Sequence, residues 1–228
     1  QLFPDEVVTI APADEGWYAV EGGRVQRAAL QPISVTAGGP DFPAVGAVVQ
    51  VSAPYALVRA WCAPDAPLRA RVGWGGVAVI EDRLSDGADE WLGLRLPGAG
   101  SLSWTLVRAW RSADRSPEAS HATVMQIDRR TRTAALLRSG RVLWRTRLAL
   151  PDDLQAGEVV LNGRRPVGQT AVPCAPWELD FGAWRLHGAY WHNHFGEPAC
   201  RPSSGNIEAS VLAAQALYAH APAAAQVI

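Results

Sequence analysis

Residues 186–206 read LHGAYWHNHFGEPACRPSSGN, and this stretch decides the fold and raises the question of function. It holds three histidines, three aromatic residues and one cysteine. Imidazoles and a thiol so close together are typical of an active site, because both groups take part in proton transfer and nucleophilic attack. Yet the run ends in Ser203, Ser204, Gly205 and Asn206, where a reactive group would be expected.

The chain as a whole has 228 residues, enough for one large domain or two small ones with a buried core. Its net charge of −1 gives no electrostatic reason to expect nucleic acid or an anionic membrane as a partner. No apolar run reaches membrane-spanning length. The three cysteines, Cys62, Cys174 and Cys200, are too few for a disulfide scaffold. We expect no cofactor.

Short apolar stretches separated by glycine and proline predict a mainly β protein. Residues 1–44 contain a β-hairpin around Gly22-Gly23, with an uncertain role. The polar residues 113–120 are the best linker and divide residues 45–112 from residues 121–228. The strands expected in the first of these two regions are 45–51, 57–61, 68–72, 77–80, 91–96 and 102–110. The acidic residues 81–90 are expected to form a solvated turn.

Residues 45–112 resemble bacterial SH3-like domains, which are small barrels that usually bind cell-wall peptides. VRAWCAPDAP looks like their first strand and turn, and LRARVGWGGVAVIED looks like the following strand, glycine turn and strand. Trp91 and Trp104 occupy the two characteristic tryptophan positions. The resemblance implies wall binding, whereas packing against a neighbouring domain is the structural alternative.

The second region begins with alternating strands, ATVMQID and RTAALLRSGRVLWRTRLAL, with a tight turn at Ser139-Gly140. It ends in a helix near IEASVLAAQALYAHA, for which Ser210 is a good N-cap. Between them, PW-x-x-x-F (176–181) and HGAYWHNHFGEP (187–198) resemble the L,D-transpeptidase catalytic domain, whose pattern is HGxYWHNxFGxP. The resemblance implies a mainly β fold with a C-terminal helix, preceded here by the SH3-like barrel. It also implies peptidoglycan stem peptides as ligands and a cell-envelope or extracellular location.

In that family FGxP is followed by Ser-His-Gly-Cys, then Val-Asn-Leu-Ser and the helix. The segment 207–210 fits Val-Asn-Leu-Ser, so Ser203-Ser204-Gly205-Asn206 takes the place of Ser-His-Gly-Cys. Ser204 then replaces the base histidine and Asn206 replaces the nucleophilic cysteine, while Cys200, Arg201 and Pro202 lengthen the loop. Acyl transfer by this route requires a thiolate and a base that act as a unit. We therefore expect a catalytically inactive centre.

What remains of the motif predicts a site for binding rather than catalysis. His187 and Gly188 are the retained HG pair of the family motif. The candidate substrate-binding residues are Tyr190, Trp191, His192, Asn193 and Phe195. Tyr190 is the better surface candidate, whereas Trp191 and Phe195 can equally belong to the core. His192 and His194 lack an obvious third ligand, so no metal site is expected.

Cys200 leaves alternatives open. It could be a relocated nucleophile of an active L,D-transpeptidase or carboxypeptidase, although the sequence identifies no replacement base. It could also pair with Cys174 in oxidising surroundings. The leading hypothesis is a non-catalytic protein that binds cell-wall stem peptides or acts as a scaffold. A third hypothesis is an interaction module for other envelope proteins.

Overall fold

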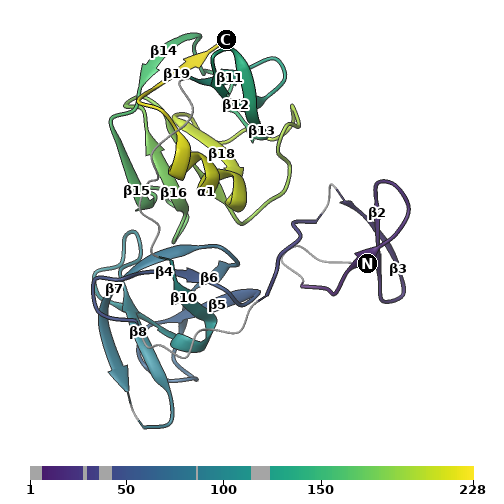
Figure 1. The fold of residues 1–228 in the computed structure, drawn as a ribbon. Helices are drawn as coiled ribbons and strands as arrows, with labels where there is room; N and C mark the ends of the chain where they lie inside the picture. The colour runs from purple at the N-terminus through teal and green to yellow at the C-terminus, as the bar shows by residue number, and fades with distance from the viewer. Residues whose placement is uncertain (1–6, 28–29, 36–42, 86, 114–123) are drawn as a thin grey trace.

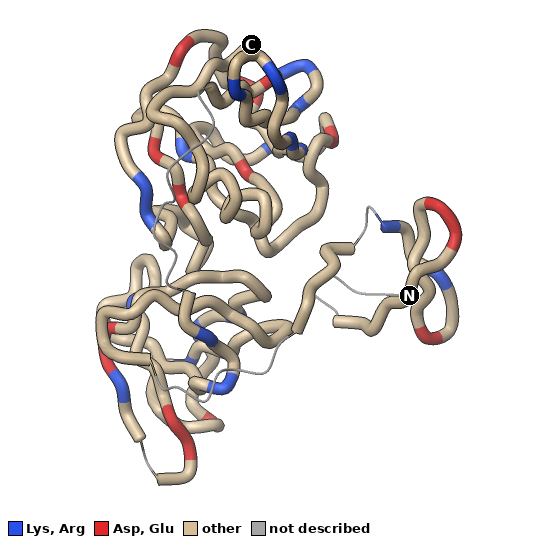
Figure 2. Tube along the Cα trace, viewed as in Figure 1, with Lys and Arg blue, Asp and Glu red and all other residues tan. Residues whose placement is uncertain are grey.

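The structure is a computed structural model that describes residues 7–27, 30–35, 43–85, 87–113 and 124–228 (Figure 1). The predicted linker lies outside the described residues except for Ala113, as do parts of the 1–44 segment. The fold is mainly β, as expected, with one α-helix in the described part of the chain. Its described strands form sheets of three, seven and nine strands. Acidic and basic residues are spread over all three (Figure 2).

The N-terminal sheet contains β1 (Ala11–Pro12), β2 (Trp17–Val20) and β3 (Gly23–Gln26), all antiparallel. Gly22 has a φ of +78°, which glycine adopts without strain, and this explains the tight turn between β2 and β3. The sheet stands apart from the two larger ones in Figure 1. The segment after it returns to the molecule, because the Asn193 amide donates to the carbonyl of Leu30 and Trp74 Nε1 donates to the carbonyl of Ser34 at 3.1 Å.

The seven-stranded unit has the strand order β10-β4-β7-β8-β9-β5-β6. Buried positions alternate with less buried ones along β5 and β9, and the inward side chains of the unit form one apolar cluster that includes Val49, Val58 and Leu92. The strands are β4 (Val48–Val51), β5 (Tyr55–Arg59), β6 (Leu68–Gly73), β7 (Val77–Ser85), β8 (Glu90–Leu94), β9 (Ser103–Leu106) and β10 (Trp110–Ser112).

Two expectations for this unit were wrong in detail. The acidic stretch 81–90 is not all turn, because β7 continues to Ser85 after an irregularity in its pairing between Ile80 and Asp82. The stretch 102–110 is not one strand, because a 3₁₀ turn at Val107–Ala109 separates β9 from β10. That turn lets the chain leave the edge of β8 and pair β10 with β4.

The nine-stranded unit has the order β14-β19-β11-β12-β13-β18-β17-β16-β15. Six of its eight strand pairs are antiparallel, and the other two, β17–β18 and β11–β19, are parallel. The strands are β11 (Val124–Asp128), β12 (Thr133–Arg138), β13 (Arg141–Ala149), β14 (Gly157–Val160), β15 (Gly163–Val167), β16 (Pro176–Asp180), β17 (Arg185–Ala189), β18 (Asn206–Ser210) and β19 (Ala224–Val227).

The helix α1 (Val211–His220) follows β18 without a loop. Ser210 caps it as predicted, because its hydroxyl accepts from the backbone N–H of Ala213 at 3.3 Å. The helix buries Ala214, Leu217 and Tyr218 in the core of the nine-stranded unit. Residues 206–210 of the predicted segment are extended and pair with β17, so the helix itself begins directly after Ser210.

The two larger units share a seam. The backbone N–H of Val77 donates to the carbonyl of Cys174 at 2.9 Å, although these residues belong to different units. Val77 is buried in the core of the nine-stranded unit, and Cys174 is buried in the core of the seven-stranded unit. A Cβ at Gly75 would lie 2.4 Å from Cγ1 of Val211, the first residue of α1. The seam therefore holds the strand–helix junction that carries the candidate site.

Candidate functional site

Two neighbouring strands present the residues of the family-like motif. β17 and β18 are parallel, with Arg185 opposite Asn206 and His187 opposite Glu208. Since side chains alternate along a strand, His187, Asn206 and Glu208 emerge on the same side of this pair. Ile207 and Ala209 point the other way into the core. The pairing thus brings together residues that are 19 positions apart in the chain.

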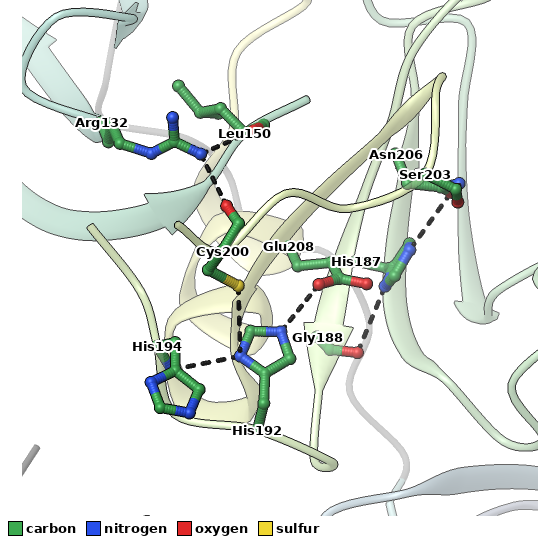
Figure 3. Close-up of polar contacts among 10 residues, drawn as sticks. All are labelled: Arg132, Leu150, His187, Gly188, His192, His194, Cys200, Ser203, Asn206 and Glu208. Carbon is green, nitrogen blue, oxygen red and sulfur yellow. Dashed lines mark hydrogen bonds and ion pairs between the residues drawn. The ribbon is translucent and has the colours of Figure 1, made fainter. Parts of the chain in front are cut away.

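Asn206 lies beside the buried imidazole of His187. Its Oδ1 is 3.3 Å from His187 Nε2, and His187 Nδ1 is 3.3 Å from the carbonyl of Gly188 (Figure 3). A neutral imidazole has a single N–H, so it donates to only one of these two oxygens. His187 is 1% exposed, which leaves it little access to solvent. The position expected for a nucleophile is therefore next to an imidazole but carries a carboxamide.

The segment 203–206 forms a turn that closes onto the start of β18. Asn206 Nδ2 donates to the hydroxyl of Ser203 at 2.8 Å, and the Asn206 N–H donates to the Ser203 carbonyl at 3.1 Å. Gly205 has a φ of +79°, which favours glycine there. Ser204 donates its hydroxyl proton to Asp153 Oδ2 at 2.6 Å. The residue at the expected base position is thus engaged with an aspartate and supplies no imidazole.

The aromatic candidates occupy different environments. Tyr190 packs at the seam, where its hydroxyl donates to the carbonyl of Pro173 at 2.6 Å. Phe195 is 8% exposed and packs in a small cluster with Ala149. Trp191 is half-buried, with its ring centroid 5.1 Å from that of Tyr190. The Tyr190 and Phe195 rings therefore serve mainly as packing contacts in this structure.

Cys200 is not in a disulfide, so the pairing with Cys174 is absent here. Its Sγ lies 3.9 Å from His192 Nδ1, and His192 Nε2 lies 2.7 Å from Glu208 Oε2 (Figure 3). Sequence reasoning found no base for Cys200 and missed Glu208 entirely. The signal that could have found it is the parallel register, which brings position 208 beside position 187.

The loop that carries Cys200 is fastened to the sheet by Arg132. The guanidinium Nη2 donates to the carbonyl of Leu150 at 2.6 Å and to the carbonyl of Cys200 at 2.8 Å. Arg132 itself has a φ of +53°, an uncommon conformation for a residue other than glycine. Burial, followed by the negative charge of Glu208, raises the pKa of the Cys200 thiol, while Arg132 opposes the rise. The thiol is therefore protonated at neutral pH.

Other features of the surface lie away from these residues. Among the residues that the structure describes, no group of three or more His, Cys, Asp or Glu side chains could hold a metal ion. One surface hollow lies between Ser85 and Arg108, and another lies beside Asp128 and Ile228. No helix in the described ranges is long and apolar enough to cross a membrane.

No protein-family model and no curated protein matches the chain. Among solved structures it is similar to an L,D-transpeptidase of Enterococcus faecium, with 15% identity, a TM-score of 0.39 and coverage of 48% of this chain and 50% of that one. It is similar to an L,D-transpeptidase of Stackebrandtia nassauensis, with 18% identity, a TM-score of 0.41 and coverage of 51% and 60%.

A third structure, the L,D-transpeptidase from Mycobacterium smegmatis, shares 14% identity, with a TM-score of 0.39 and coverage of 67% of this chain and 90% of that one. The chain spans about half the length of the first of these structures. The structural neighbours are thus L,D-transpeptidases of low identity and low overall superposition.

Proposed function

We propose that this chain is a peptidoglycan-associated, L,D-transpeptidase-like protein that binds cell-wall stem peptides without acyl transfer at residue 206. The observation that carries the proposal is the 3.3 Å contact between Asn206 Oδ1 and His187 Nε2. A carboxamide can donate and accept hydrogen bonds there, but it is no substitute for a thiolate nucleophile. The site holds the imidazole of His187, but it has a hydroxyl at residue 204 and a carboxamide at residue 206.

The tract HGAYWHNHFGEP supports the peptide part of the proposal, because it is the wall of the site in the family that it resembles. The His194 side chain is 56% exposed, against 14% for that of His192, so it is the more accessible imidazole of the tract. Trp191, His192 and Asn193 are half-buried beside it. We assign these four residues, which form one loop, to contact with the peptide.

The seven-stranded unit is the second candidate for wall contact, since its sequence resembles SH3-like domains. Trp61 lies after β5 and is 55% exposed, which is unusual for so large an apolar side chain. An indole can stack on the apolar face of a sugar or peptide. Both proposed contacts agree with a location in the cell envelope or outside the cell.

Retention of the purified chain on purified sacculi tests this function. The wild-type protein is expected to sediment with sacculi and to be released by a soluble stem peptide. His194→Ala should weaken retention if the loop binds, and Trp61→Ala should weaken it if the seven-stranded unit binds. Glu81→Ala is the matched surface control, because it removes only the exposed ion pair with Arg95.

The outcomes separate the competing functions. Loss of retention in His194→Ala, with an unchanged muropeptide profile in Asn206→Ala, supports the proposal. No retention of the wild-type chain on sacculi overturns it. If the chain then captures envelope proteins instead, the interaction module is the remaining function.

A further inference from the structure

A thiol, an imidazole and a carboxylate form a row of three contacting side chains beside Asn206. Cys200 Sγ is 3.9 Å from His192 Nδ1, and the other nitrogen of the same ring is 2.7 Å from Glu208 Oε2 (Figure 3). Cys200 and His192 come from the same loop, and Glu208 comes from β18. The arrangement does not involve His187, which contacts Asn206.

The hydrogen-bond partners assign the proton on the imidazole. Glu208 Oε2 can only accept when the carboxylate is ionised, so His192 Nε2 donates to it. His192 Nδ1 then carries the lone pair, and it already accepts from the backbone N–H of His194 at 3.2 Å. The same lone pair faces the sulfur of Cys200. This is the tautomer that a base needs in order to take the S–H proton.

The surroundings keep this pair of side chains partly out of water. The His192 side chain is 14% exposed and that of Glu208 is 12% exposed. The ring centroid of Phe195 lies 4.7 Å from that of His192, and this packing limits the movement of the imidazole. Charge interactions are stronger where water is scarce, so Glu208 can stabilise a positive charge that develops on His192. Because the pKa of the Cys200 thiol is raised, attack by its sulfur requires such a base.

We propose that Cys200 is a nucleophile for acyl groups, with His192 as its base and Glu208 as the residue that positions His192. The S–H proton passes to His192 Nδ1 while the sulfur attacks an amide carbonyl carbon. A carbon–sulfur bond forms, the carbon–nitrogen bond breaks, and the proton on His192 passes to the leaving nitrogen. Water or an amine then cleaves the thioester, and its proton returns to sulfur through His192.

The reactivity of the thiol and the identity of its acyl donor are separate matters. Assignment of a peptide amide as the donor rests on the stem-peptide binding proposed above. The nucleophilic thiol itself does not rest on it, because a small activated amide can reach a half-buried cysteine without a peptide site. A carbapenem is such an amide, since its strained ring opens on attack and remains attached to sulfur.

The test is acylation of the full chain by a carbapenem, followed by intact-mass and peptide mass spectrometry. The wild-type chain is expected to gain the mass of one intact carbapenem on the peptide containing Cys200, and Cys200→Ser should gain none. Cys62, which is also half-buried and in no disulfide, is an internal reference thiol. His192→Asn should slow acylation by roughly a hundredfold, the lower end of general-base effects.

Controls separate a positioning role from a structural one. Arg201→Gln, in the same loop as Cys200, removes an exposed ion pair with Asp152 and should leave the rate within about twofold of wild type. Glu208→Gln should slow acylation by roughly tenfold, and Glu208→Asp should recover part of the rate. The pH profile of Cys200 alkylation by iodoacetamide should lose its neutral-pH component in His192→Asn and Glu208→Gln. A merely structural residue would not change that profile.

The proposal is overturned if the peptide containing Cys200 gains no carbapenem, or if His192→Asn reacts as fast as wild type. Melting temperatures of all variants show whether a slow variant is simply unfolded. In that case the alkylation pH profile of folded wild-type Cys200 decides, because an unassisted thiol with a raised pKa reacts only at alkaline pH. Retention on sacculi is scored separately with Cys200→Ser, so loss of peptide binding and loss of thiol reactivity are distinguishable.

Discussion

Asn206→Cys places a thiol at the position that His187 faces, and it tests the register on which the inactive centre depends. In the wild-type chain Asn206 Oδ1 is 3.3 Å from His187 Nε2. The cysteine sulfur would take the place of the Asn206 amide carbon. This carbon is at most about 1.2 Å further from His187 Nε2 than Asn206 Oδ1 is, because that is the length of the C=O bond. A small change in the side-chain torsion then brings sulfur and Nε2 within contact. The change is made in a Cys200→Ser background so that only one thiol of the site is present.

The cost of this change to stability is small. Asn206 loses its 2.8 Å hydrogen bond to Ser203 and the long contact with His187, which amounts to about 1–2 kcal/mol of unfolding free energy. Against this, assistance by His187 should raise the rate of thiol alkylation at pH 7 by roughly a hundredfold over an unassisted cysteine. Iodoacetamide labelling followed by mass spectrometry measures this rate, with Cys62 in the same chain as the reference.

The double variant Asn206→Cys/His187→Ala is the decisive comparison. If His187 assists the new thiol, removing it should lower the alkylation rate by the same factor of roughly a hundred. If the alkylation rates with and without His187 are equal, residue 206 does not occupy a position where an imidazole activates a nucleophile. The inactive-centre reasoning would then be refuted even though both side chains touch in the structure.

Three further predictions concern stability and are checked by urea unfolding. Burial raises the pKa of Cys174 from 9.0 to about 12, so the folded thiol keeps its proton while the unfolded chain loses it. Stability should therefore fall by about 1.4 kcal/mol for each pH unit between 9 and 12, and Cys174→Ala should remove this dependence. Gly75→Ala should cost about 2–5 kcal/mol, because its φ is +84° and its Cβ would lie 2.4 Å from Val211 Cγ1. Gly22→Ala, where φ is +78° and no atom lies within 4 Å of the new Cβ, should cost only about 1–2 kcal/mol. Equal losses of stability in the two glycine variants would argue against the close packing of Gly75 on Val211 at the seam. Tyr190→Phe should cost about 1 kcal/mol, since it leaves a half-buried carbonyl without its 2.6 Å donor, and an unchanged unfolding curve would show that water replaces the hydroxyl.

The parts of the fold that sequence could predict are local ones. Ser210 caps α1 because its hydroxyl reaches an N–H only three residues ahead. The β2–β3 and β12–β13 hairpins turn at Gly22 and Gly140, where the backbone has positive φ. At such positions the residue type limits the backbone conformation directly, so the cap or turn can be predicted without knowing any distant contact.

The parts that sequence could not predict depend on distant pairing. β19 (Ala224–Val227) inserts beside β11 as a parallel strand, although the helix had been expected as the last element. Its short, alanine-rich sequence carries no pattern that distinguishes it from a loop. The seam likewise joins Val77 to Cys174, two positions that look like ordinary core residues of separate units. Only the folded arrangement assigns each to the core of the other unit.

The candidate site shows the same division between local motif and distant contact. Aligning SSGN with the expected nucleophile position concerns a few consecutive residues, and the structure places Asn206 in contact with His187. The relation of Cys200 to His192 depends instead on the path of the loop between them, which Arg132 holds from the turn between β11 and β12. Two imidazoles thus face two different positions, and the loss of a thiol at one of them does not determine what happens at the other. Alkylation of Cys200 in the His192→Asn chain, and of the thiol introduced by Asn206→Cys in the His187→Ala chain, measures each imidazole separately. A rate that depends on His192 but not on His187 for Cys200 would mean that nucleophilic function moved along the loop rather than disappearing.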